Sequence, residues 1–175
     1  LVPAGQMPAL PVPGAHADMI RLAEWIDRNR SGLDAVTVTM DHHHRLDIAH
    51  PPFWRTGDGS AVAPFTRISA EQVRKGEFVA APGLDNRRAQ AYLEALEKSD
   101  RFAHMVWPIH CQIGTWGQCI HSELQHALDR WEDAKSHGVQ HVLKGENPWT
   151  EHYSALRAEI PISDDPRTGL DRNLL

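Results

Sequence analysis

Four residues of this chain could together form a divalent-metal site with a cationic side chain beside it. Asp41 and His43 are two positions apart, so in an extended segment a carboxylate oxygen and an imidazole nitrogen can converge on one divalent ion. His110, in the sequence Trp-Pro-Ile-His-Cys, would complete a set that leaves coordination positions open for substrate, as catalytic metal sites do. Lys144 follows an apolar run and could charge a nucleophile or carry protons.

Each pattern also has a simpler interpretation when it is taken alone. Asp41 could cap a turn, with His43 a solvated loop residue. Trp107 could be a core residue before a proline turn, with His110 a satisfied buried histidine, and a lone lysine at a strand end is usually solvated. Other histidines in polar segments, such as His152, are predicted to lie at the surface. The metal hypothesis therefore depends on the residues being brought together.

The elements that position these residues are predicted from hydrophobic periodicity. Apolar residues recur at helical spacing in three segments, residues 17–29, 85–98 and 122–136. Short apolar runs predict buried strands at residues 35–40 and 139–143, and residues 102–107 are predicted to form a short strand. Asp18 is expected to cap the first helix.

Strands that alternate with helices predict an α/β fold, a three-layer α/β/α arrangement with a mainly parallel sheet. Asp41 and Lys144 each come directly after a predicted strand. Because ligands bind beyond the carboxyl ends of parallel strands, both residues are expected on one rim of the sheet. His110 joins them if the strand at 102–107 forms.

Prolines and glycines interrupt residues 45–83, which predicts an irregular insertion within a single domain spanning 1–175. Its aromatic residues could pack the segment over a neighbouring cleft, and they are Phe53, Trp54, Phe65 and Phe78. A lid over the site and a structural flap both remain open interpretations.

Composition excludes several classes of function. The length of 175 residues and the hydrophobic fraction of 41% fit one globular domain with a real core. A net charge of -5 and scattered cations argue against a nucleic-acid partner. No apolar run is long enough to predict a membrane span, and the two cysteines are too few for a disulfide scaffold, which favours the cytoplasm.

Several stretches, taken in order, resemble nicotinamidases, the metal-dependent amidases of NAD salvage within the isochorismatase-like cysteine hydrolases. The resemblance is carried by Leu10-Pro11-Val12-Pro13-Gly14-Ala15, by Asp41-His42-His43 with Ala49-His50-Pro51, by the run from Trp107 to Gly117, and by Val142-Leu143-Lys144-Gly145. It is most specific from Trp107 to Gly117 and weakest between Arg55 and Arg101.

The resemblance implies a divalent metal ion, with zinc expected first and iron or manganese as alternatives, held by the residues that match Asp41, His43 and His110. His50 matches a position that is a further ligand in some members. In this family the metal binds the ring nitrogen of a small carboxamide such as nicotinamide, and an aromatic residue that matches Trp107 lines the ring pocket. Members often self-associate, so a homo-oligomer is a possible assembly.

The residue that matches Lys144 belongs to an Asp, Lys and Cys triad. The aspartate takes the thiol proton, the cysteine attacks the amide, ammonia leaves and water frees nicotinic acid. No aspartate precedes Asp18 and no cysteine follows Lys144, while Cys111 and Cys119 do not match the context of the nucleophile.

These departures lead us to expect an incomplete isochorismatase-like domain, truncated at both ends, that holds the ring but does not cut the amide alone. The alternatives are another isochorismatase-like cysteine hydrolase or amidase, and a non-catalytic metal-binding fragment.

Overall fold

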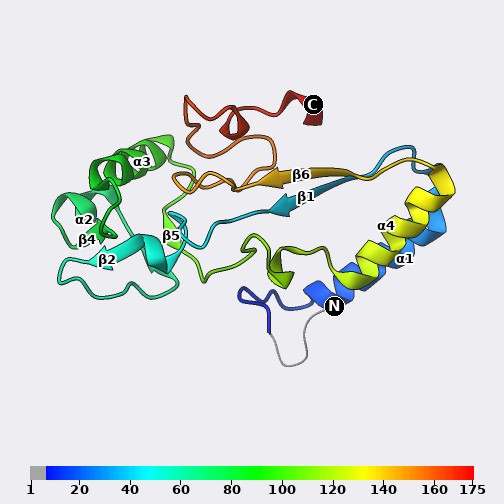
Figure 1. The fold of residues 1–175 in the computed structure, drawn as a ribbon, viewed down its shortest axis with the longest axis horizontal. Helices are drawn as coiled ribbons and strands as arrows, with labels where there is room; N and C mark the ends of the chain where they lie inside the picture. Colours follow the sequence, from blue (N-terminus) through cyan, green and yellow to red (C-terminus); the bar gives the residue numbers. More distant parts are fainter. Residues whose placement is uncertain (1–6) are drawn as a thin grey trace.

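The computed structural model describes residues 7–175, and two parallel strands join its two ends (Figure 1). β1 (Thr37–Asp41) pairs with β6 (Gln140–Lys144) in a register that places Asp41 directly opposite Lys144. The predicted α/β class with a parallel sheet is confirmed. Because parallel strands end at the same edge, both site residues leave the sheet together, as expected.

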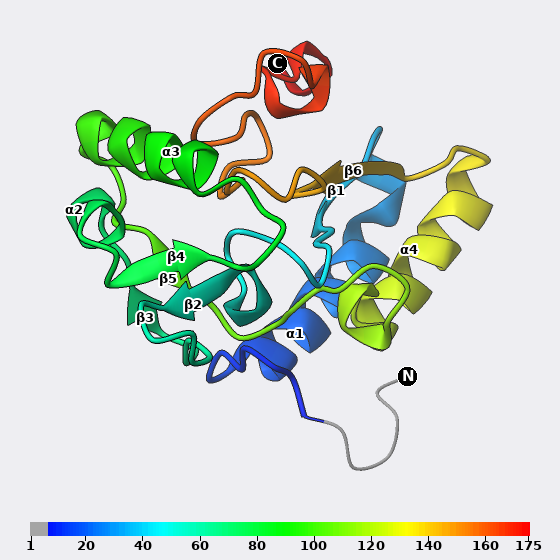
Figure 2. The same ribbon diagram turned by 60° about the vertical axis from the view of Figure 1, so that its left-hand side comes forward.

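At one end of the molecule, helices α1 (Ala15–Asn29) and α4 (Ser122–Lys135) pack side by side (Figures 1 and 2). Their apolar faces form a core with residues of the neighbouring strand and loops, and its buried members are Ala23, Ile26, Ala127, Leu128 and Trp131. The expectation that Asp18 caps α1 is wrong. Gly14 occupies the N-cap position, and the Asp18 carboxylate instead pairs with Arg21 at 2.7 Å.

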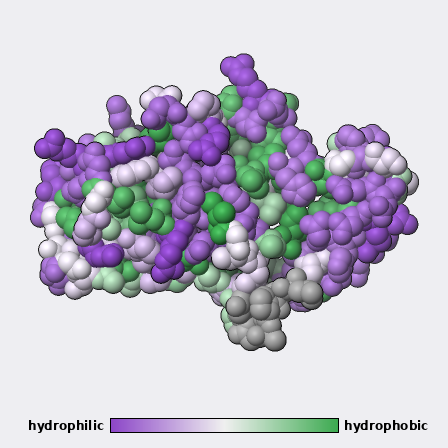
Figure 3. Space-filling view, in the orientation of Figure 1, coloured by the Kyte–Doolittle hydropathy of each residue, from purple (hydrophilic) through white to green (hydrophobic). Residues whose placement is uncertain are grey.

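The β1 strand is less covered than its β-branched sequence predicts. Val38 packs against the helical core, but the side chains of Thr37 and Thr39 are exposed to solvent. Leu143 of β6 is 43% exposed, and Figure 3 shows hydrophobic atoms at the surface in the middle of the molecule. The prediction of a strand buried on both faces is therefore wrong, because within residues 7–175 Val38 packs against the core of α1 and α4 while Thr37 and Thr39 face solvent.

The other end of the molecule contains the remaining strands and two helices (Figure 2). These elements are β2 (Trp54–Thr56), β3 (Thr66–Arg67), α2 (Ala70–Arg74), β4 (Phe78–Ala80), α3 (Asn86–Ser99) and β5 (Met105–Val106). Short 3-10 helices also occur, at Arg30–Gly32, Pro51–Phe53, Trp116–Gln118, Pro166–Thr168 and Arg172–Leu174. β2 pairs with β4 and β3 pairs with β5, both antiparallel.

Residues 45–83 are folded into this end and share one core with α3. Phe53 and Trp54 are buried there beside Leu93 and Leu96. Asp85 caps α3, because its carboxylate accepts hydrogen bonds from the backbone N–H groups of Arg87 and Arg88. The lid interpretation of the segment stays a prediction. Within residues 7–175, no helix is long and apolar enough to cross a membrane.

Candidate metal centre

Three predicted ligands meet at the carboxyl end of β1. Asp41 ends the strand, and the backbone then stays extended through His43, whose N–H donates to the Cys111 carbonyl at 3.1 Å. The N–H of Ile113 returns a hydrogen bond to the His43 carbonyl at 3.0 Å, which fixes the segment after His110 beside it. One ligand atom each from Asp41, His43 and His110 lies within 4.8 Å of the other two.

The donor set suits a divalent cation. His110 Nδ1 donates to the Pro108 carbonyl at 2.8 Å, so its Nε2 keeps a free lone pair. Burial lowers the pKa of His110, which favours the neutral imidazole that binds metals. One carboxylate and two imidazoles leave further coordination positions open.

His50 lies behind this set rather than within it. Its ring is fully buried, and its Nδ1 donates to the His44 carbonyl at 3.0 Å. Its Nε2 is 3.3 Å from His110 Nδ1, and the centroids of the two rings are 5.1 Å apart. Burial lowers the pKa of His50 to about 4, so the ring is neutral and can support His110 without adding charge.

Lys144 contacts the set through Asp41. Its ammonium donates to the Asp41 carboxylate and also to the His152 carbonyl at 2.9 Å. His152 is buried, so its predicted surface position is wrong, and its Nδ1 accepts the N–H of Gly145 at 3.2 Å. Lys144 thus has a fixed partner on each side of its ammonium group.

Gly145 leaves room for the His43 ring, and this suggests a first test. A Cβ at Gly145 would lie 2.6 Å from His43 Cε1, and the backbone there has φ +88°. Gly145→Ala should displace the ring, weaken divalent-metal binding and cost about 1–3 kcal/mol of unfolding free energy. Metal titration and urea unfolding measure both effects.

Gly59→Ala is the matched control, because Gly59 has φ +87° but nothing within 4 Å of an added Cβ. It carries the same backbone strain without the contact to His43. Equal metal affinity in the two variants would show that Gly145 does not support the ligand.

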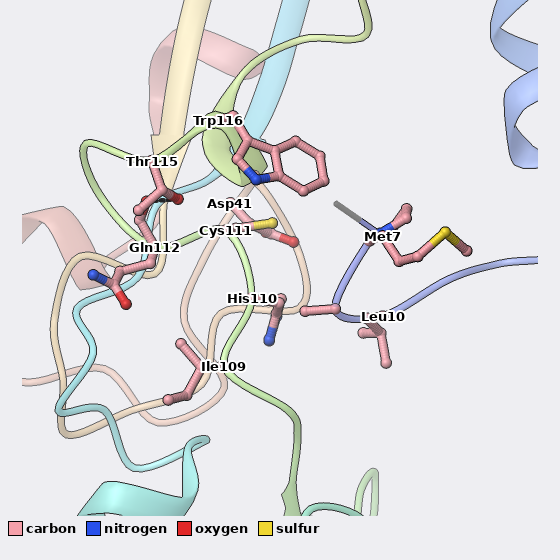
Figure 4. Close-up of a pocket in the computed structure, with 12 residues that line it drawn as sticks. Met7, Leu10, Asp41, Ile109, His110, Cys111, Gln112, Thr115 and Trp116 are labelled. Carbon is pink, nitrogen blue, oxygen red and sulfur yellow. Dashed lines mark hydrogen bonds between the residues drawn. The ribbon is translucent and has the colours of Figure 1, made fainter. Parts of the chain in front are cut away.

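A pocket of about 590 Å³ opens beside two of the ligands (Figure 4). Figure 4 shows the Asp41 carboxylate and the Cys111 thiol between the Trp116 ring and His110. The lining residues are Met7, Pro8, Ala9, Leu10, Asp41, Ile109, His110, Cys111, Gln112, Thr115, Trp116 and Gly117. None of them comes from residues 45–83.

Trp116, not Trp107, is the tryptophan that lines this pocket. Trp107 is half-buried, its backbone N–H donates to the Ala49 carbonyl at 2.7 Å, and its ring meets Phe65 edge to face at 6.2 Å. The direction of Trp116 depends on the turn that follows His110, where Cys111 has φ +44° and Gly114 has φ +77°. The only sequence signal for Trp116 was its place in the Trp107 to Gly117 run.

Cys111 reaches the pocket but is a poor nucleophile there. Burial, reinforced by the Asp41 carboxylate, raises the pKa of its thiol to about 11, and the opposing effect of Lys144 is smaller. The thiolate fraction at neutral pH is therefore very small. Cys119 is exposed and lies 3.8 Å from the Thr115 carbonyl.

No protein-family model and no curated protein matches the chain. Solved structures do match. The yeast nicotinamidase Pnc1p superposes with a TM-score of 0.55 at 18% identity, over 90% of this chain and 57% of that one. Pnc1p bound to the inhibitor nicotinaldehyde gives a TM-score of 0.53 at 18% identity, over the same 90% and 57%.

A nicotinamidase/pyrazinamidase from Acinetobacter baumannii is 20% identical, with a TM-score of 0.49 over 86% of this chain and 50% of that one. This chain therefore spans a little more than half the length of the yeast enzyme. The fold expected from the motifs is confirmed, because the chain has the fold of the yeast nicotinamidase over that part of its length.

Proposed function

We propose that this chain is the ring-binding and metal-binding part of an amidase that hydrolyses nicotinamide to nicotinic acid and ammonia. The observation that carries the proposal is the convergence of Asp41, His43 and His110 beside a pocket with an aromatic wall. The shared fold with a nicotinamidase that binds nicotinaldehyde supports a small planar carboxamide as the substrate.

The pocket residues suit a flat heteroaromatic ring. The Trp116 indole offers an apolar face, and Met7 and Leu10 supply apolar surface opposite it (Figure 4). A divalent ion held by Asp41, His43 and His110 would supply a Lewis-acidic position for the ring nitrogen, as the family resemblance implies. Trp107, whose ring contacts Phe65, remains a second proposed ring contact on the strength of the resemblance.

Lys144 is proposed as the catalytic lysine, and we assign two effects to its positive charge. Its ammonium neutralises Asp41 and sits at the rim where an attacking thiol would need a positive charge. The nucleophile itself is proposed to come from the whole protein, because the raised pKa of Cys111 makes that thiol a poor candidate. Cytoplasmic location and self-association remain predictions.

Ammonia release by the full-length protein tests the proposal. With zinc, iron(II) or manganese supplied, nicotinamide should be hydrolysed. Benzamide has the same shape and the same amide group but no ring nitrogen to bind the metal, so it should react much more slowly. Lys144→Ala should lose turnover and retain metal. No ammonia from nicotinamide with any of these metals would refute the amidase, and metal binding without turnover would favour the non-catalytic alternative.

A further inference from the structure

The imidazole of His43 is held by a buried carboxylate that no sequence motif indicated. His43 is 4% exposed, and its Nδ1 lies 3.2 Å from Oδ2 of Asp47, which is 1% exposed. The second oxygen of Asp47, Oδ1, accepts the backbone N–H of Ala49 at 2.9 Å. Both oxygens of this carboxylate therefore have a donor, and its orientation is fixed.

The turn that contains Asp47 also reaches the second imidazole ligand. The Asp47 carbonyl accepts the N–H of His50 at 2.8 Å, and His50 Nε2 lies 3.3 Å from His110 Nδ1. The neighbouring Ile48 N–H donates to the Pro148 carbonyl at 2.9 Å, which ties the turn to the loop after β6. Two backbone hydrogen bonds thus hold the turn that places the Asp47 carboxylate beside His43.

The contact decides which nitrogen of His43 carries the proton. An ionised carboxylate only accepts hydrogen bonds, so His43 Nδ1 must be the donor. In the neutral ring Nε2 then has the free lone pair, which is the form a metal requires. Asp47 itself lies outside the converging set of Asp41, His43 and His110.

We propose that Asp47 is a positioning residue that selects the Nδ1–H tautomer of His43 and so presents Nε2 to the divalent ion. The inference rests on the metal site of the proposed function and adds the residue that prepares one of its ligands. Outer partners of this kind typically change metal affinity by about 10–100-fold.

Asp47→Asn is the decisive variant, because it keeps the shape of the side chain and reverses the direction of its hydrogen bond with His43 Nδ1. Ala49 N–H continues to need an acceptor, so the amide oxygen stays toward Ala49 and the amide NH2 faces His43 Nδ1. Nδ1 must then accept, which moves the ring proton to Nε2. We expect zinc affinity to fall by about 10–100-fold with the far-UV circular dichroism spectrum unchanged.

Asp47→Ala removes the orienting bond but allows either tautomer, so it should lose less zinc affinity than Asp47→Asn. A purely structural role would give the opposite order, because asparagine fills the space better than alanine. Asp85→Asn is the control for the substitution itself, since Asp85 caps α3 and asparagine caps equally well. Zinc affinity in Asp85→Asn should match that of the wild type.

Nitrogen-15 NMR of the metal-free, full-length protein reads the tautomer directly when the signal of the neutral ring is followed at alkaline pH. Nδ1–H in the wild type and Nε2–H in Asp47→Asn would support the inference. Nε2–H in the wild type, or equal zinc affinity in wild type and Asp47→Asn, would overturn it. A wild type that shows Nδ1–H and binds zinc but releases no ammonia would refute only the proposed function.

Discussion

His43→Ala and His110→Ala should each lose bound divalent metal almost completely after dialysis. Each change removes one of three converging donors, so affinity should fall by more than the roughly 10–100-fold expected for an outer partner such as Asp47. If the proposed function holds, the Michaelis constant of the full-length protein for nicotinamide should rise as well, because the proposed contact between the ring and the ion is lost. Metal stoichiometry by mass spectrometry and a chelator-competition titration measure the effect.

His44→Ala is the matched control for these variants. His44 is adjacent in sequence but its side chain is exposed, and only its backbone carbonyl contacts the cluster, through His50. Its metal content should equal that of the wild type. Unchanged metal stoichiometry in both His43→Ala and His110→Ala would refute the ligand assignment.

The sequence predicted the rim of the site because that rim follows from periodicity. Asp41 and Lys144 are the last residues of β1 and β6, and the ends of paired parallel strands lie at the same edge of the sheet. His110 was expected there through a strand at 102–107, but β5 pairs antiparallel with β3 in another sheet, and hydrogen bonds between His43 and the segment after His110 bring His110 to the rim instead. The placement of Asp41 and Lys144 needs only local pattern and the geometry of a parallel sheet.

The parts that surround the rim could not be predicted, because they depend on the paths of irregular loops. Asp47 meets His43 through a turn held by Pro148, a residue far away in the chain. Trp116, which lines the pocket, follows an irregular turn in which Cys111 has a positive φ, and periodic patterns do not encode such a turn. Local sequence therefore identifies candidate ligands better than the groups that orient them.

The second large expected effect concerns Glu151 and the pH dependence of the unfolding free energy. Its carboxyl group is buried, and Oε1 has no hydrogen-bond partner among the described residues. Burial, reinforced by Asp47, raises its pKa to about 8, and the opposing charges of His43 and Lys144 do not offset this. The folded protein therefore keeps a neutral acid where the unfolded chain has an ordinary carboxylate.

The sign of the pH dependence follows from these two pKa values. Below the ordinary value of 4.5 both states are protonated, and between 4.5 and about 8 only the folded state holds the proton. The unfolding free energy should therefore fall as pH rises through this window, by up to about 1.4 kcal/mol per pH unit from this group. Glu151→Gln, neutral and of the same size, should not show this decline.

Urea unfolding of the metal-free protein at pH 5, 6.5 and 8 tests this expectation. The advantage of Glu151→Gln over the wild type should grow from near zero at pH 5 to on the order of 2–4 kcal/mol at pH 8. Glu77→Gln, at an exposed position, is the control and should follow the wild type. Parallel curves for wild type and Glu151→Gln would show that Glu151 ionises without cost in the folded protein.

Urea unfolding of the wild type and Glu151→Gln in the presence of zinc tests whether the ionisation of Glu151 is coupled to metal binding. Glu151 is close enough to His43, Asp41 and Asp47 for their charges to affect its pKa. A cation bound by Asp41 and His43 would favour the ionised form of Glu151 and lower its pKa. The advantage of Glu151→Gln at pH 8 should therefore shrink when zinc is added, and by linkage Glu151→Gln should bind zinc more weakly than the wild type at that pH.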